Sequence, residues 1–239
     1  MPANKALLLH AFRERISNLN RLLLAIGVFV MSPIVWVFSG SRVDLPGEGV
    51  SMILALIFGA GVIGSDMSTG VIHLVLVRPV TRSFYVIAKW FAAGGLAAGI
   101  AVVQTILAVM WNEMHGGAVP LMDIVSVVLL QVSTAFGLAA VLTVLSVIAE
   151  GLGNLRIWIL TVILGEVVGS LGGFRNWAWA QRMAKEISNL LLPKIDLSMM
   201  VGYSPFPWIY LVAFVSTVTL SLAVAIHLFN RKEMTYGAG

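Results

Sequence analysis

Residues 121–149 have the sequence LMDIVSVVLLQVSTAFGLAAVLTVLSVIA, whose only charged residue is Asp123. A helix needs about 20 residues to cross a hydrocarbon layer of about 30 Å, and this run is longer than that. It therefore predicts a membrane-spanning helix that tilts or extends into water. Other apolar runs, each flanked by charged residues, recur along the whole chain.

The composition also indicates a membrane protein. Hydrophobic residues make up 59% of the 239 residues and charged residues 11%, and the mean hydropathy is +0.96. A soluble protein has about 25% charged and 45–50% apolar residues. With 15 Lys and Arg and 11 Asp and Glu, this chain has too little polar material to cover a soluble globule. Soluble enzymes, secreted disulfide scaffolds and disordered chains are therefore excluded, and the absence of cysteine agrees with excluding a disulfide scaffold.

Six apolar runs are long enough, alone or with flanking residues, to cross a bilayer. They predict an all-α, polytopic membrane protein with a single transmembrane domain over residues 1–239; counts of five or seven spans stay open. The predicted spans are residues 22–38, 50–64, 90–111, 121–149, 157–171 and 208–229.

The positions of Lys and Arg predict the orientation. Cytoplasmic loops carry an excess of these residues, and six spans place both termini on the richer side. That side holds Lys5, Arg13, Arg15, Arg21, Arg78, Arg82, Lys89, Arg156, Arg231 and Lys232, and the other side holds Arg42, Arg175, Arg182, Lys185 and Lys194. We therefore expect both termini in the cytoplasm and a location in the cell (inner or plasma) membrane.

Two segments outside the spans have the pattern of amphipathic helices. In residues 1–20 an apolar stripe of Leu8, Phe12, Ile16 and Leu19 lies opposite Lys5, Arg13 and Ser17, which predicts a helix in the inner headgroup layer. In residues 172–207, the external segment before the last span, the stripe is Trp179, Met183, Ile187 and Leu190, and Pro193 ends it. We expect an interfacial anchor there; a lid that returns toward the membrane is the alternative.

The loop of residues 65–89 between the second and third spans has the most specific pattern in the chain. Asp66 follows a span, Gly70 comes four residues later, and an apolar run ends at Pro79. Thr81 is a candidate N-cap for the third span. The pattern predicts a short helix at the inner surface, apolar enough to dock on a partner and ended by proline.

This loop resembles the second-to-third-span loop of ABC transporter permeases, the membrane subunits of type 2 ABC exporters. That loop has an acid, a glycine, a leucine-rich run, Pro-Val-Ser/Thr-Arg, and a lysine that enters the next span. The matching residues are Asp66, Gly70, Leu74, Leu76, Pro79, Val80, Thr81, Arg82 and Lys89. The departures are Asp66 where Glu is more frequent, Val71 where Thr usually follows the glycine, and His73 where an acid is common.

The resemblance implies a permease subunit that forms the translocation path of an exporter with a second permease copy, as a homodimer or heterodimer. It implies that the loop is a coupling helix that contacts a separate ABC ATPase (nucleotide-binding) subunit. The residues implied in this contact are Asp66, Gly70, His73, Leu74, Leu76, Pro79 and Arg82. The chain has no G-x-x-x-x-G-K-[ST] phosphate-binding loop, so ATP and Mg would bind to the partner and no cofactor is expected here. An ordinary connection between two helices is the alternative for the loop.

Three polar residues in the spans are candidates for the translocation path or its gate. Glu166 is the strongest, because an acid inside a span is costly and usually faces a cavity or a partner; the alternative is an ion pair with Arg175 or a local hydrogen bond near the outer interface. Gln104 and Gln131 are weaker candidates, since a span glutamine also serves as a hydrogen-bond donor between helices.

Small-residue stripes occur on two spans, with Gly165 and Gly169 on the fifth and Gly95 and Gly99 on the third. Small residues let helices approach closely in lipid, either within one chain or between two. The resemblance implies a subunit interface at the fifth span, which favours that role for Gly165 and Gly169.

Two other function classes are weighed against an exporter subunit. An intramembrane enzyme is disfavoured, because the chain has no Gly-x-Ser-Gly serine elbow and no pair of aspartates within the spans. No catalytic residue and no metal site is therefore expected. A membrane scaffold, or a motility or secretion component without transport, is the remaining alternative.

Overall fold

The computed structural model describes residues 2–39, 43–72, 80–174, 177–195 and 208–232, and within these residues it contains helices and no strand. The helices are α1 (Pro2–Ser17), α2 (Leu19–Ser39), α3 (Glu48–Gly59), α4 (Gly64–Ser68), α6 (Arg82–Met114), α7 (Leu121–Ile148), α8 (Gly153–Phe174), α9 (Ala178–Leu191) and α10 (Trp208–Arg231). Six of the helical segments are long and apolar enough to cross a membrane: α2, α3 continued by α4, α6, α7, α8 and α10. The predicted all-α fold with six such helices is therefore confirmed.

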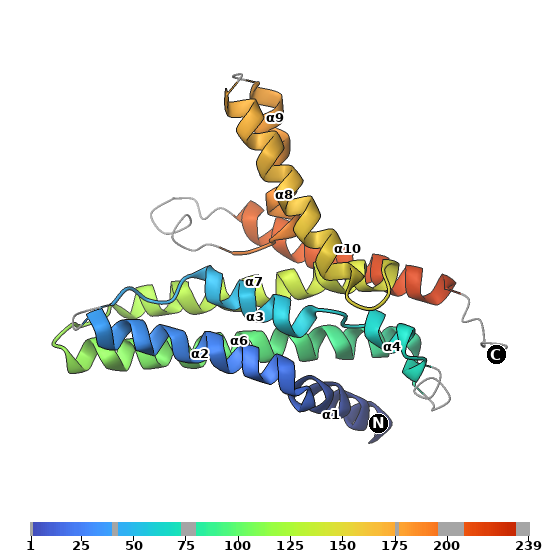
Figure 1. Cartoon of the computed structure of the whole chain (residues 1–239), viewed down its shortest axis with the longest axis horizontal. Coiled ribbons are helices and arrows are strands. Elements are labelled where there is room, and N and C mark those ends of the chain that lie inside the picture. The colour runs from blue at the N-terminus through green and yellow to red at the C-terminus, as the bar shows by residue number, and fades with distance from the viewer. Residues whose placement is uncertain (1, 40–42, 73–79, 175–176, 196–207, 233–239) are drawn as a thin grey trace.

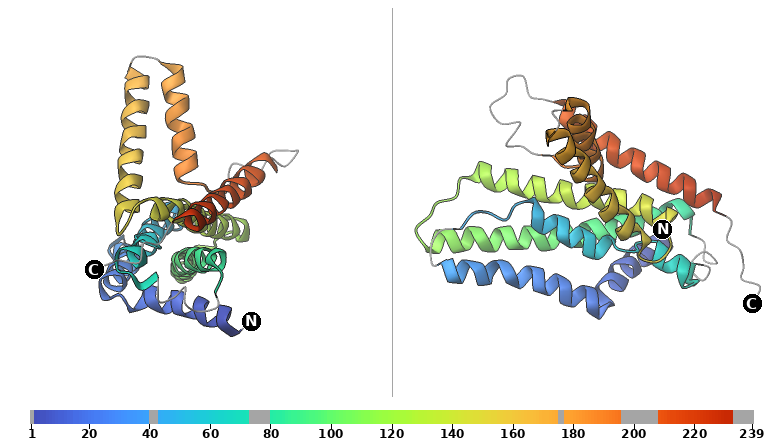
Figure 2. Two further views of the ribbon diagram at one scale, coloured as in Figure 1. Left: turned by 90° about the vertical axis from the view of Figure 1, so that its right-hand side faces the viewer. Right: turned by 45° about the horizontal axis from the view of Figure 1, so that its top comes forward.

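Four of these segments form a bundle. α2, α3, α6 and α7 lie side by side, and α10 lies along α7 (Figure 1). α8 and α9 pack against each other as a hairpin that leaves the bundle at a steep angle (Figure 2). α1, α4 and the C-terminal end of α10 lie at the same end of the bundle, which we call the α1 end.

The centre of the bundle is held together by small residues. α6 buries Ala88, Ala92, Ala97 and Ala101, and a Cβ atom on Gly94 would lie only 2.7 Å from the ring of Phe136 on α7. Helices in lipid gain stability from close packing rather than from a hydrophobic drive. Gly94 and the buried alanines therefore allow the α6 backbone to approach α7 closely.

The predicted stripe of Gly95 and Gly99 has a different environment. A Cβ atom on Gly95 would lie 3.3 Å from the ring of Phe12 on α1, and one on Gly99 would meet no atom within 4 Å. α6 begins at Arg82, eight residues before the predicted start, because the Thr81 cap starts the helix ahead of a stretch that carries the cations Arg82 and Lys89, which the predicted span leaves out.

The second span is not one continuous helix. α3 has 12 residues, about 18 Å at 1.5 Å per residue, and residues 43–47 before it are not helical. Residues 60–63 after it form a turn, which we call the interruption, in which Gly61 has φ of +59°. A positive φ suits glycine because it has no Cβ to clash with the backbone.

α1 packs on the bundle mainly through residues outside the predicted apolar stripe. Leu7, Ala11 and Arg15, four residues apart, are buried, whereas Ile16 is 46% and Leu19 65% exposed. The small side chain of Ala11 allows α1 to approach α6. Ile16 and Leu19 of the predicted stripe stay on the outside, where a lipid headgroup layer could cover them, whereas Phe12 of the stripe contacts Phe91 of α6.

α9 forms within the predicted external segment, and its return to the bundle is well defined. Trp179, Met183 and Leu190 of the predicted stripe are each more than half exposed. After α9, Ile195 donates its N–H to Ser133 Oγ of α7 at 2.9 Å, and Lys194 pairs with Glu48 at 2.5 Å. The chain therefore comes back to the bundle after α9.

Candidate functional site

The candidate site is a cluster of buried charges at the α1 end that joins three helices. Lys89 Nζ of α6 lies 2.6 Å from Asp66 Oδ2 of α4 and 2.5 Å from Glu14 Oε2 of α1. Tyr85, one helical turn before Lys89, donates its hydroxyl hydrogen to the same oxygen of Asp66. Positions i and i+4 share one face of a helix, so α6 directs both Tyr85 and Lys89 toward α4.

Burial makes this cluster sensitive to any change. Asp66 and Lys89 are buried, while Glu14 is 30% exposed. Removing one member of a buried ion pair leaves an uncompensated charge, which typically costs 3–5 kcal/mol. A cavity of about 10 Å³ beside the cluster, lined by Leu7, His10 and Ala88 among others, has room for about one water molecule. The cluster is thus a compact joint between α1, α4 and α6.

Two arginines bind the carbonyls of the interruption from the side of α1. Arg15 donates from Nη2 to Val62 O at 2.6 Å and from Nη1 to Ala60 O at 3.4 Å. Arg21, at the start of α2, donates from Nη2 to Ala60 O at 2.9 Å. Arg15 is fully buried; burial lowers the pKa of its guanidinium, and the adjacent Glu14 carboxylate opposes that change.

The N–H groups of the interruption are bound from the opposite side. Ser146 Oγ of α7 accepts from Ile63 N at 2.8 Å and from Gly64 N at 2.7 Å. Asn154 of α8 is fully buried; its Oδ1 accepts from Gly61 N at 2.9 Å and its Nδ2 donates to Gly59 O at 2.9 Å. A non-helical backbone is tolerated at membrane depth where the protein supplies such partners.

The residues assigned to the predicted coupling loop divide into two groups. Asp66 lies in the charge cluster, Gly70 follows α4 with φ of +72°, and Arg82 donates from Nη1 to Asn230 O of α10 at 3.2 Å. Thr81 is the N-cap of α6, since its Oγ1 accepts from Phe84 N at 3.3 Å. The other predicted residues lie outside the described residues: His73, Leu74, Leu76 and Pro79.

The glutamines of the spans form hydrogen bonds to irregular backbone. Pro33 has no N–H, so it leaves the carbonyl of Phe29, four residues earlier, without a helical donor. Gln104 Nε2 donates to this carbonyl at 3.1 Å and to Val28 O at 3.1 Å. Gln131 Nε2 donates to Pro46 O at 2.7 Å. These contacts correspond to the structural alternative for the glutamines, and their role in a translocation path stays a prediction.

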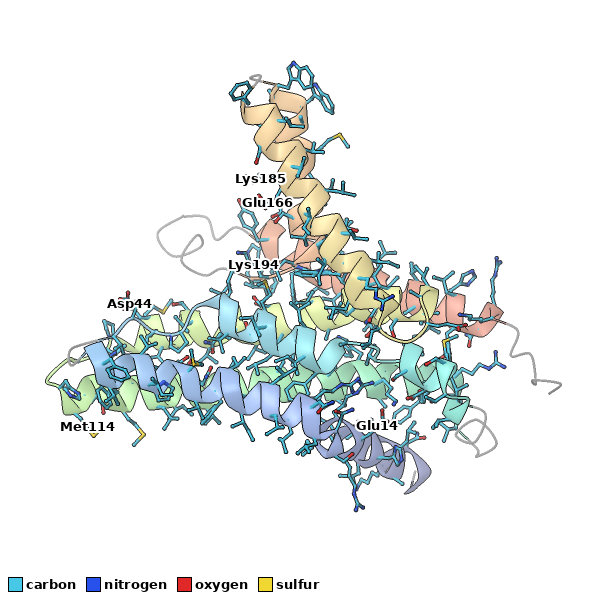
Figure 3. All side chains as sticks on the ribbon, viewed as in Figure 1. Glu14, Asp44, Met114, Glu166, Lys185 and Lys194 are labelled. Atoms are coloured by element: carbon cyan, nitrogen blue, oxygen red, sulfur yellow. The ribbon has the colours of Figure 1, made fainter. Side chains whose placement is uncertain are left out.

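Glu166 lies on the exposed side of α8, away from the bundle (Figure 3). Lys185 of α9 is on the same hairpin, and no described residue forms an ion pair with Glu166. Figure 3 also shows Glu14 and Met114 at opposite ends of the bundle, so the charge cluster lies at the end opposite to the C-terminal end of α6. Glu166 is therefore not part of the buried site.

The glycines of the fifth span contact α9 of the same chain. A Cβ atom added to Gly165 would lie 3.5 Å from Ile187, and one added to Gly169 would lie 3.0 Å from Ala184. Their small size is thus used within the α8–α9 hairpin, as in the intrachain alternative. A further role of this hairpin between subunits stays a prediction.

The sequence did not single out several residues of the site. No sequence pattern gives Glu14, Ser146 or Asn154 a role, and Arg15 and Arg21 enter the sequence predictions only through the orientation. A usable signal was present in Tyr85 and Lys89, which place two polar groups on one face of an apolar helix.

Comparison with known proteins gives no relative: no family model, no curated protein and no solved structure matches this chain.

Proposed function

We propose that this chain is the membrane-spanning permease subunit of an ATP-driven ABC exporter, with residues 65–89 as the loop that contacts a separate ATPase subunit. The observation that carries the proposal is the ion pair between Asp66 and Lys89 at the base of this loop. These two residues occupy the first and last positions of the motif that resembles the exporter loop. The ion pair therefore holds the two ends of the motif together.

A loop with a joined base can transmit movement. α4 leads into the loop, and α6 leaves it from the Thr81 cap. Because Lys89 also contacts Glu14, a displacement of the loop acts on α1, α4 and α6 together. This is the property that a contact with an ATPase requires if ATP-driven motion is to reach the spans.

The exposed apolar helices are compatible with a second permease copy. In the most apolar windows of α2, α8 and α10, only 11%, 17% and 6% of the residues are buried within the chain. In the proposed assembly, lipid and a second subunit cover these surfaces, the termini and the loop face the cytoplasm, and ATP and Mg bind to the ATPase.

Purification of the complex tests the proposal. The full chain, carrying an affinity tag and expressed in its native host, is extracted in mild detergent, and the attached proteins are identified by mass spectrometry. We expect an ABC ATPase in stoichiometric amount, lost or uncoupled when Pro79 and Arg82 are replaced by alanine. A complex without a nucleotide hydrolase would refute the proposal and favour a scaffold, motility or secretion component.

The orientation is tested with single cysteines, because the chain contains none. A membrane-impermeant maleimide on intact cells should label a Lys185→Cys variant, and a Val75→Cys variant only after permeabilisation. The cysteine-free parent is the control. The reverse labelling would place the loop on the outer side and contradict the ATPase contact.

A further inference from the structure

The interruption of the second span leaves backbone groups that side chains from other helices bind. Its Ala60 and Val62 carbonyls accept hydrogen bonds from Arg15 and Arg21. The N–H of Gly64, just after it, donates to Ser146. The N–H of Gly61 donates to Asn154 of α8, so the partners come from four helices outside the second span: α1, α2, α7 and α8.

These groups have an alternative set of partners within the second span itself. In a continuous α-helix the N–H of residue i+4 donates to the carbonyl of residue i. Ala60 O would then accept from Gly64 N, and Val62 O from Asp66 N. In the structure Gly64 N is bound to Ser146 and Asp66 N to Ile63 O instead.

The glycines of this region permit both arrangements. Gly61 has φ of +59° in the interrupted form, and glycine also adopts helical φ values at low cost. The interrupted form is stabilised by the turn between α7 and α8, where Gly151 donates its N–H to Gly64 O at 2.9 Å. A Cβ atom on Gly64 would lie 2.7 Å from Ala149 O, so the contact needs glycine.

We infer that the interruption is a two-state joint and that Arg15 and Arg21 are positioning residues that hold it in the interrupted form. When α1 is docked, the two guanidinium groups bind the carbonyls and the turn of residues 60–63 separates α4 from α3. When the arginines leave, α3 and α4 join into one helix and α4 changes direction. Asp66 moves with α4, so the base of the loop changes position relative to α6.

The physical basis is a competition for the same acceptors. The Arg15 guanidinium is fully buried, and its Nε has no hydrogen-bond partner. The hydrogen-bonding needs of the arginine are therefore only partly met in this position. A charged donor forms a stronger hydrogen bond to a carbonyl than a neutral amide does, which favours the interrupted form as long as α1 is docked. The inference concerns the fold alone and does not depend on the proposed ATPase.

Distance measurements between two spin labels test the inference. Ser68 on α4 is exposed, and Met114, 71% exposed, marks the far end of α6. Ser68→Cys and Met114→Cys are introduced into the cysteine-free full chain, which is labelled, reconstituted in liposomes and measured by double electron–electron resonance. We expect one narrow distance in this parent and a second, separate distance in the Arg15→Gln variant.

Matched variants make the result decisive. Arg13→Gln removes the same charge from an exposed position of α1 and should reproduce the parent, whereas Arg15→Lys should give a smaller second population because an ammonium group lacks the planar fork of a guanidinium. If Arg15→Gln does not fold, Arg21→Gln, which removes one bond to Ala60, is measured in its place. A single unchanged distance in both arginine variants, or the same change in Arg13→Gln, would overturn the inference.

Discussion

Replacing Asn154 by alanine tests whether the hydrogen bonds around the interruption stabilise the fold. Asn154 is fully buried and its amide group bonds to Gly59 O, Gly61 N and, at 3.3 Å, Leu142 O. In the Asn154→Ala variant Gly61 N loses its acceptor, whereas Gly59 O keeps a second donor, Val62 N at 3.2 Å.

The magnitude follows from this difference. A buried donor left without an acceptor costs about 1–3 kcal/mol, and each bond lost to a carbonyl that keeps another donor costs about 0.5–1.5 kcal/mol. Interhelical hydrogen bonds in membrane proteins contribute toward the low end of such ranges. We therefore expect a loss of about 2–3 kcal/mol, which corresponds to a decrease of roughly 4–12 °C in Tm for a chain of this size.

The assay is thermal unfolding in detergent, followed by the intrinsic fluorescence of the 7 tryptophans. The control is Asn189→Ala, which removes the same amide group from an exposed position of α9 and should change Tm by little. Equal Tm values for the two variants would refute the reasoning, because the bonds of Asn154 would then not contribute to the stability of the interruption.

Three further variants are measured in the same assay. Lys89→Leu leaves the buried Asp66 carboxylate without its cation and should lower the free energy of unfolding by about 3–5 kcal/mol. Adding Asp66→Asn should restore part of this loss, and no restoration would contradict the ion pair. Gly137→Ala places a Cβ atom 2.1 Å from the backbone carbonyl oxygen of Pro193, after α9. It should lower the free energy of unfolding by about 1–3 kcal/mol, and an unchanged Tm would contradict that contact. Gln104→Leu should lower the free energy of unfolding by about 1–2 kcal/mol in the parent. The loss should be much smaller in a Pro33→Ala background, where the Phe29 carbonyl regains its helical donor. Equal losses in both backgrounds would show that the glutamine does not compensate for the proline.

The sequence predicts the six apolar helices well, because hydropathy is summed over some 20 residues and a few errors do not change the result. It places the ends of the helices less well. α6 begins at Arg82 rather than at residue 90 because Thr81 caps the helix there, whereas the predicted span leaves out the stretch between the cations Arg82 and Lys89. The predicted N-terminal helix is present as α1. Its contact with the bundle through Ala11 and Arg15 was not part of the prediction, since a stripe analysis favours large apolar residues.

The candidate site was predictable only in part, since its contacts join distant parts of the chain. Asp66 was singled out through the loop motif, and its partner Lys89 belongs to the same motif. The bonds of Arg15 to residues 60–62 and of Asn154 to residues 59–61 span more than 40 residues of sequence, and no local pattern encodes them. The glycines at 59, 61 and 64 have no explanation in the sequence alone, because Gly59 packs against Leu142 of α7, and Gly61 and Gly64 pack against the turn between α7 and α8.

The short second span has a consequence for the fit between this protein and the bilayer. α3 is about 18 Å long, and 61% of the most apolar window of the segment Glu48–Ser68, which α3 begins, is buried within the chain. The helices with most of their surface exposed have 21 residues (α2), 22 (α8) and 24 (α10), or about 31–36 Å. The hydrophobic mismatch of α3 is therefore concealed from the lipid, and the preference of the protein for membrane thickness is determined by the longer helices around it.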